Sequence, residues 1–560
     1  MFALPPRARG EERVEPQSAQ AQAVTAAHGM VVAQEAIAAR VGAEILQKGG
    51  NAIDAAVATG FALAVTYPRA GNIGGGGFMV IHRSSGEDTT IDYRETAPAA
   101  IDGKSFLDAQ GNADPEKSRN SALAIGVPGT VAGLSLAEQK YGSGKFTLAE
   151  LMAPAIALAS DGFVVADDTA DSLPRDEPRL KRWPSTAKVF FKADGAVLAA
   201  GDRLTQPDLA ATLQGIAQNG PRDFYEGATA QKIALAVQSA GGVMTAADLK
   251  NYRAIERAPV RGTYRGYDIV SMPPPSSGGI ALVEMLNILE GYDLAHDSQA
   301  QELFLLVEAM KRAYADRAFF LGDPDVVKVP VARLISKDYA QAWRQTIDPE
   351  HATAAKDIKP FAAPADGEGR NTTHYSVIDS FGNAVANTYT LNFSYGVGLV
   401  ADGTGIVLNN ELDDFAAKAE VPNAYGLIGY EANAPGPGKR PLSSMTPTIV
   451  LKDGKPFLVT GSPGGSLIIN AVLQVTVGVI DRGMDIAAAV ASPRLHNQWM
   501  PDRVFAEPGF PDEVIQALEA RGDAVMVRKL PTSANSILAT PSGFIGAADP
   551  RTRGALAVGY

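Results

Sequence analysis

A threonine at position 372 stands where the chain changes from a polar, breaker-rich segment to a strand-like run. The preceding segment contains Pro364, Gly367 and Gly369, and the run from 372 to 379 begins Thr-Thr-His-Tyr-Ser. The hydroxyl of a threonine at such a junction could attack the peptide bond before it, and cleavage would free its own α-amine. That amine could then act as the base for the same hydroxyl, which is the threonine variant of nucleophilic catalysis. Taken alone, Thr372 is also an ordinary β-branched strand residue.

Short motifs on both sides of Thr372 favour the catalytic interpretation of this residue over the structural one. They are Asp92-Tyr93-Arg94-Glu95, Pro273 to Gly279, Gly382-Asn383-Ala384-Val385, Thr388 to Asn392, Asn409 to Phe415, Arg440 to Met445 and Gly461 to Ser466. This ordered set closely resembles the γ-glutamyltranspeptidases, a family of N-terminal nucleophile hydrolases, over nearly the whole chain. The resemblance is specific because separate motifs occur in the right order.

The resemblance implies that the chain is a precursor that cleaves itself between Asn371 and Thr372. A large chain, residues 1–371, and a small chain, residues 372–560, would then associate as a heterodimer and form one structural unit. The freed α-amine of Thr372 titrates near pH ~8, so it can serve as a base without help from a histidine.

The resemblance also assigns the residues around the nucleophile. Thr390 is implied as the hydroxyl that hydrogen-bonds Thr372, and Asn392 as a substrate contact. Gly464 and Gly465 are implied as the oxyanion hole, where two successive backbone N–H groups face the developing charge and a side chain would obstruct the approach. By themselves, a strand threonine and a Gly-Gly turn are common features without function.

The donor would be a γ-glutamyl compound such as glutathione, and the acceptor water, an amino acid or a short peptide. Arg94 matches the arginine that pairs with the α-carboxylate, since its planar fork binds carboxylates bidentately. Ser443 and Ser444 match the pair that contacts the same carboxylate. Glu411 and Asp414 match the positions that hold the α-amino group.

The resemblance also includes one departure, at Glu411, and one further position, Tyr425. Many family members carry glutamine at the position of Glu411, and the difference is mild because both side chains accept hydrogen bonds. Residues 419–430 resemble the lid loop that some members place over the glutamyl pocket, with Tyr425 as the gating tyrosine. Loop segments with Pro and Gly are natural lids, although an inert surface loop has the same composition.

Composition narrows the classes of function. The net charge of −12 argues against nucleic-acid binding. The chain has no cysteine, which excludes disulfides and thiolate chemistry, and none of its six histidines lies within five residues of another. No metal or organic cofactor is implied.

The longest apolar stretch, residues 55–65, is too short to span a membrane. The first 20 residues lack the apolar core of a signal peptide, whereas the family resemblance implies a periplasmic or secreted enzyme.

Periodicity and breakers predict the elements that position these residues. Helices are expected at 30–49, 52–65 and 298–320, in most of 120–260, and near 465–482, 485–492 and 512–521. Strands are expected at 78–82 and 86–96. Two hairpins are expected, 372–379 with 384–392 and 446–452 with 455–460, each around a turn that contains glycine. The glycine run at 74–77 is not a phosphate loop, because it leads into a strand, and we expect close backbone packing there.

Hairpins with helices before and after them indicate an α+β sandwich. The four-layer α-β-β-α arrangement of the N-terminal nucleophile hydrolases, formed jointly by both processed chains, is implied by the resemblance. Two alternatives remain open. One is a cephalosporin or glutaryl acylase on the same scaffold, and the other is a non-catalytic glutamyl-binding protein that never matures.

Overall fold

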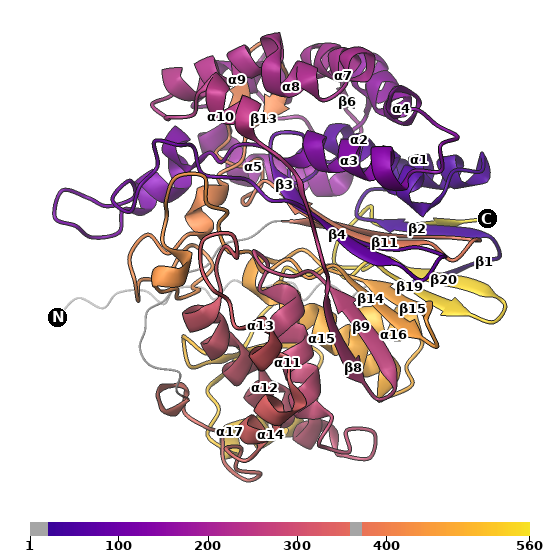
Figure 1. The fold of residues 1–560 in the computed structure, drawn as a ribbon, viewed down its shortest axis with the longest axis vertical. Helices are drawn as coiled ribbons and strands as arrows, with labels where there is room; N and C mark the ends of the chain where they lie inside the picture. Colours follow the sequence, from indigo (N-terminus) through magenta and orange to yellow (C-terminus); the bar gives the residue numbers. More distant parts are fainter. Residues whose placement is uncertain (1–20, 359–371) are drawn as a thin grey trace, which may run out of the picture.

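A computed structural model describes residues 21–358 and 372–560. Within these two ranges the strands form two seven-stranded sheets and three smaller ones. The two large sheets pack face to face, with helices on both outer faces (Figure 1). Val32 and Phe78 from one sheet share a hydrophobic core with Ile449 and Val459 from the other. The predicted α-β-β-α sandwich is confirmed.

The sheet that contains the hairpin after Thr372 has the strand order β21-β2-β10-β11-β3-β4-β7, with antiparallel pairing throughout. Its strands are β21 (Leu556–Gly559), β2 (Gly29–Ala33), β10 (Thr373–Asp379), β11 (Ala384–Thr390), β3 (Gly76–His82), β4 (Asp88–Tyr93) and β7 (Ile255–Arg257). Strands from both ends of the chain therefore flank the predicted hairpin, which is confirmed as β10 and β11.

The second large sheet has the order β1-β20-β19-β15-β14-β9-β8. Its strands are β1 (Ala23–Ala26), β20 (Gly543–Ala547), β19 (Ser536–Thr540), β15 (Lys455–Thr460), β14 (Thr448–Lys452), β9 (Tyr267–Ser271) and β8 (Val260–Tyr264). The smaller sheets pair β5 (Phe163–Val164) with β6 (Arg203–Leu204), β12 (Val400–Ala401) with β13 (Ile406–Val407), and β16 (Leu495–His496) with β17 (Val504–Ala506) and β18 (Val525–Val527).

Helices from the first half of the chain lie over the outer face of the first sheet (Figure 1). They are α1 (Ala36–Gln47), α2 (Ala52–Thr66), α3 (Thr130–Tyr141), α4 (Leu148–Asp161), α5 (Asp167–Leu180), α6 (Pro184–Phe190), α7 (Pro207–Asn219), α8 (Arg222–Glu226), α9 (Ala228–Ser239) and α10 (Ala246–Asn251). The buried face of α2 contacts β10 and β11 directly, so this layer supports the strands next to Thr372.

The opposite outer layer is built from later helices (Figure 1). They are α11 (Gly278–Leu289), α12 (Gln299–Phe320), α13 (Val331–Leu334), α14 (Lys337–Arg344), α15 (Ile468–Ile480), α16 (Ile486–Ala491) and α17 (Asp512–Ala520). The α11 helix packs on β8 and β9, and α12 packs on α11. Among the described residues, no helix combines the length and apolar character needed to cross a membrane.

One predicted helix is wrong in its first part. Residues 30–33 belong to β2, and the helix begins only at Ala36, where the side chain of Glu35 accepts hydrogen bonds from the backbone N–H groups of Ile37 and Ala38. An apolar run is compatible with either element, and pairing with β10 and β21 decides for a strand. The predicted cap of the next helix is confirmed, since Asn51 forms a capping box at the start of α2.

The glycine run at 74–77 serves close packing, as predicted. A Cβ atom on Gly75 would lie 2.1 Å from the carbonyl oxygen of Thr390, and one on Gly76 would lie 2.4 Å from the carbonyl oxygen of Tyr93. Both distances are too short for any side chain. The run therefore lets β3 and the loop before it pass directly beside Thr390 and beside the end of β4, which leads into Arg94.

Candidate active site

Thr372 lies immediately before β10, and Thr390 is the last residue of β11. The antiparallel register pairs Thr373 with Tyr389, which places the two threonines side by side. The hydroxyl of Thr372 donates to the hydroxyl oxygen of Thr390 over 3.5 Å, and the same oxygen accepts from the backbone N–H of Asn392 at 2.8 Å. Asn371 lies outside the described residues.

Thr372 lines a small cavity of about 20 Å³. Every described candidate from the sequence lines this cavity except Gly464. The lining residues are Arg94, Thr372, Thr390, Asn392, Glu411, Asp414, Tyr425, Leu427, Ser443, Ser444, Met445, Gly465, Ser466 and Ile468. Residues from Arg94 to Ile468 in sequence thus meet at one point of the fold.

The two glycines lead into α15 through a short 3₁₀ turn, Gly465–Leu467. The φ angles of Gly464 and Gly465 are 134° and 57°, a region that L side chains rarely adopt. A Cβ atom on Gly465 would also lie 2.3 Å from the ring of Tyr425. Both conformation and space therefore require glycine at position 465, which faces the cavity.

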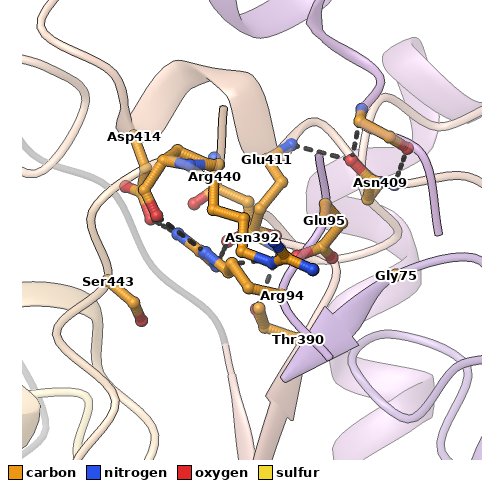
Figure 2. Close-up of polar contacts among 12 residues, drawn as sticks. Gly75, Arg94, Glu95, Thr390, Asn392, Asn409, Glu411, Asp414, Arg440 and Ser443 are labelled. Atoms are coloured by element: carbon orange, nitrogen blue, oxygen red, sulfur yellow. Dashed lines mark hydrogen bonds and ion pairs between the residues drawn. The ribbon is translucent and has the colours of Figure 1, made fainter. Parts of the chain in front are cut away.

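Arg94 lies at the centre of a buried charge cluster (Figure 2). Its Nη2 donates to the Asp414 carboxylate at 2.5 Å, its Nη1 donates to Glu411, and its Nε donates to the carbonyl oxygen of Pro441 at 3.1 Å. Glu95 lies 3.8 Å from Nη1. Sequence reasoning assigned Arg94 to one end of a ligand and Glu411 and Asp414 to the other, whereas the structure pairs them with one another.

The acidic residues of this cluster outnumber the arginine, and their protonation follows from burial. Burial raises the pKa of Glu95 to about 8, although Arg94 acts in the opposite direction. Burial likewise raises the pKa of Glu411 well above its ordinary value. Glu411 accepts a hydrogen bond from Nη1 of Arg94, which a glutamine oxygen could also accept.

The serine pair lies across the cavity on the segment after Arg440. The hydroxyl oxygen of Ser443 accepts from the backbone N–H of Met445 at 3.1 Å, and that of Ser444 accepts from Nη2 of Arg317 at 3.2 Å. Since each oxygen already accepts a hydrogen bond from the protein, each hydroxyl hydrogen can be donated to a ligand. Such an arrangement suits an anionic group in the cavity.

Tyr425 closes the cavity from the loop that sequence reasoning identified as a lid. Its hydroxyl donates to Asn392, and its ring stands against Gly465. The loop is held by Asn423, whose side-chain oxygen accepts from the backbone N–H groups of Tyr425 and Leu427. Tyr425 thus connects the cavity to residues 419–430, and the role of this loop as a lid stays a prediction.

His374 does not contact Thr372. Its ring nitrogens face the hydroxyls of Thr388 and Ser376, at 2.8 and 3.0 Å. Because the Ser376 hydroxyl donates to the carbonyl of Asn535, Ser376 accepts from Nε2, and Nδ1 accepts from Thr388. Burial lowers the pKa of His374 to about 3, so the ring is neutral at physiological pH.

Sequence reasoning missed two charged residues at the site. Glu95 follows Arg94 within a quoted motif, but nothing in the motif shows that its carboxylate is fully buried and that neither oxygen has a hydrogen-bond partner among the described residues. Arg317 lies in α12, and a charged residue on a face that is otherwise apolar was the available signal.

The chain is similar to known proteins in sequence and in structure. A family model described as gamma-glutamyltranspeptidase matches residues 38–559. The glutathione hydrolase proenzyme of Escherichia coli (strain K12) is 51% identical over 540 residues, 96% of this chain and 93% of that protein. A cephalosporin acylase from Bacillus halodurans has a similar structure, with a TM-score of 0.85, 28% identity and 99% coverage of both chains. A Helicobacter pylori gamma-glutamyltranspeptidase chain has a TM-score of 0.56 and 45% identity, covering 58% of this chain and 93% of its own.

Proposed function

The chain belongs to the γ-glutamyltranspeptidase family and is an enzyme with the γ-glutamyltransferase and glutathione hydrolase activity of that family, and we propose how its residues perform this activity. The observation that carries the proposal is the shared cavity, where the adjacent hydroxyls of Thr372 and Thr390 meet Arg94, Ser443 and Ser444. One nucleophile and one anion-binding group therefore lie within the reach of a single small donor.

Maturation comes first in this proposal. The Thr372 hydroxyl attacks the carbonyl carbon of Asn371, and the peptide nitrogen leaves as the α-amine of Thr372. Water then hydrolyses the resulting ester, which regenerates the hydroxyl and leaves residues 1–371 and 372–560 as two chains that stay associated. The proenzyme names of the bacterial relatives support this step, as does the position of Thr372 directly before a buried strand.

Catalysis then uses the freed amine. It takes the hydroxyl proton of Thr372 as the oxygen attacks the γ-carbonyl of the donor, and the hydroxyl of Thr390 holds the nucleophile in place. The oxyanion receives hydrogen bonds from backbone N–H groups at Gly464 and Gly465. The proton passes to the leaving amine, and a γ-glutamyl ester remains on Thr372. Water or the amine of an amino acid or peptide then attacks this ester, which regenerates the hydroxyl.

Donor binding uses both charges of the glutamyl α-carbon. The α-carboxylate contacts Ser443, Ser444 and Arg94, and the α-ammonium contacts Asp414 and Glu411, because each needs partners of opposite character. A cavity of about 20 Å³ does not hold a glutamyl group. Movement of Tyr425 with its loop therefore belongs to the proposal as the step that admits the donor. An exported location, periplasmic or secreted, is proposed from the family resemblance.

The test is steady-state cleavage of a γ-glutamyl anilide by the matured protein, with and without a dipeptide acceptor. We expect anilide release in water and a new γ-glutamyl peptide when the acceptor is present. Failure to cleave the anilide under any condition would contradict the proposal. A single uncleaved band on a denaturing gel together with glutamate binding would indicate the non-catalytic alternative.

The cephalosporin acylase remains the second candidate, because a protein of that name shares the fold over 99% of this chain. Competition between the γ-glutamyl anilide and a cephalosporin with an aminoadipyl side chain distinguishes the two. The acylase alternative predicts a higher kcat/KM for the cephalosporin. Our proposal predicts a higher kcat/KM for the anilide.

A further inference from the structure

Arg317 on α12 is a buried arginine whose hydrogen-bond partners are serine hydroxyls. Its side chain is almost fully buried, and among the described residues no acidic group forms an ion pair with it. The other arginine of the helix interior, Arg312, shows the usual arrangement and pairs with Glu308 at 2.7 Å. A buried charge that is left unpaired is costly. Arg317 therefore needs an explanation outside the stability of its helix.

The contacts of Arg317 lead directly to the serine segment of the cavity. Its Nη2 donates to Ser444 at 3.2 Å, and its Nε donates to Ser277 at 3.0 Å. The hydroxyl of Ser277 in turn donates to the carbonyl oxygen of Ser443 at 2.6 Å. One guanidinium thus fixes the side chain of one cavity serine and, through Ser277, the backbone of the other.

Ser277 belongs to the Pro-Pro-Pro-Ser-Ser-Gly-Gly motif, which has no assigned role so far. The backbone N–H of Ser277 donates to the carbonyl of Ser443 at 2.8 Å, and that of Ser443 donates to the carbonyl of Pro275 at 2.9 Å. Ser276 adds a bond from its hydroxyl to the carbonyl of Met445 at 2.6 Å. The motif therefore holds the serine segment by backbone and side-chain hydrogen bonds, and Arg317 donates hydrogen bonds to both the motif and the segment.

The charges around the cavity show why a second cation is useful. Arg94 already forms ion pairs with Glu411 and Asp414, so a donor carboxylate must compete with two protein carboxylates for it. Among the described residues no carboxylate forms an ion pair with Arg317, and Asp414 acts on it only as a more distant charge. Burial lowers its pKa to about 10, which still leaves the guanidinium charged at neutral pH.

We propose that Arg317 is a positioning residue for the donor α-carboxylate, acting through Ser444 and Ser277. Its guanidinium does not contact the substrate directly. It orients the Ser444 hydroxyl so that its hydrogen points into the cavity, it holds the backbone of Ser443 through Ser277, and its positive charge favours an anion there. The proposal rests on the proposed function, since it concerns the same donor, and it assigns a role to a helix of the large chain in recognition by the small chain.

The test compares two donors that differ only at the α-carbon, a γ-glutamyl anilide with a free α-carboxylate and its α-carboxamide analogue. In Arg317→Met, we expect KM for the carboxylate donor to rise about tenfold, as for loss of a hydrogen bond to a charged group. KM for the carboxamide donor should change by less than about threefold, and kcat should stay within the same limit for both. Arg317→Lys keeps the charge and should recover part of the difference.

Arg312→Lys is the matched control, because it changes a buried arginine of the same helix that does not reach the serine segment. It should leave the ratio of the two KM values unchanged. Equal effects of Arg317→Met on both donors, or no effect on the carboxylate donor, would overturn the proposal. If Arg317→Met fails to mature, an unchanged KM ratio in Arg317→Lys would overturn it equally.

A binding measurement separates this inference from the proposed function. Calorimetric titration with L-glutamate and with its α-carboxamide gives the carboxylate preference without catalysis. Inactivity of the parent protein toward the anilide would contradict the proposed function alone. The loss of carboxylate preference in titrations of Arg317→Met would still support the inference, and an unchanged preference would refute it.

Discussion

Replacement of Arg94 by lysine tests the recognition of the donor most sharply. The guanidinium makes three directed contacts, to Glu411, to Asp414 and to the carbonyl oxygen of Pro441. A lysine ammonium is a single point on a flexible stem and cannot reproduce this fork. At least one buried carboxylate would lose its partner, and the donor would lose a bidentate contact.

The size of the effect follows from these contacts. Truncating one partner of a buried, hydrogen-bonded charge pair costs ~2–5 kcal/mol. At 1.36 kcal/mol for each factor of ten, this range corresponds to about 30-fold to several thousandfold. Because lysine keeps the positive charge, we expect the lower end, a rise in the donor KM of about 30-fold in Arg94→Lys. Arg94 does not contact the reacting carbonyl in our proposal, so kcat should change much less.

The assay is steady-state cleavage of a γ-glutamyl anilide by matured Arg94→Lys, with folding checked by circular dichroism and maturation by a denaturing gel. Arg312→Lys serves as the control for loss of a buried guanidinium away from the cavity. An unchanged KM in a folded, matured Arg94→Lys enzyme would remove Arg94 from the donor site and refute the reasoning.

The remaining predictions concern pH and backbone space. We expect kcat/KM to rise with pH around pH ~6–9 as the terminal amine loses its proton. His374→Gln should show the same rise, because burial holds the pKa of His374 near 3. Loss of the rise in a matured variant would show that the histidine is the base. Gly465→Ala should lower kcat/KM about a hundredfold, because its Cβ would lie 2.3 Å from the Tyr425 ring and displace the loop. Gly438→Ala, which is also at positive φ but in open space, is the control. Equal activity of the two variants would refute the argument. Burial raises the pKa of Glu95 to about 8 in the folded state. The contribution of this carboxyl to the free energy of unfolding therefore falls as pH rises from its unfolded pKa through 8. Glu95→Gln should therefore gain melting temperature relative to the parent as pH rises from about 5 to about 8.5, and a constant difference would show that Glu95 does not titrate in this range.

Local signals in the sequence were sufficient for elements whose pattern and caps agree. The capping residue Asn51, the hairpin after Thr372 and the long helix ending at Phe320 are confirmed within a few residues. Residues 30–33 were placed in a helix because an apolar run has no period of its own. Their pairing partners β10 and β21 lie more than 300 residues away, and no local pattern contains that information.

The same limit applies to the site. The family motifs pointed to residues that line one cavity, but residue types alone did not show that Arg94 is bound by Glu411 and Asp414. Nor did they show that Arg317 contacts Ser444, because that hydrogen bond joins a helix to a segment 127 residues away. Hydrogen-bond partners that are distant in sequence are set by the packing of the two sheets and their helices.

The central claim is that Thr372 becomes the N-terminal residue of a small chain and is the nucleophile of the enzyme. N-terminal sequencing of the fragments from the purified protein, run beside Thr372→Ala, tests it most directly. We predict a small fragment that begins Thr-Thr-His-Tyr in the parent protein, and a single inactive chain in the variant. A small fragment with another N-terminus, or cleavage of Thr372→Ala at the same bond, would contradict the claim.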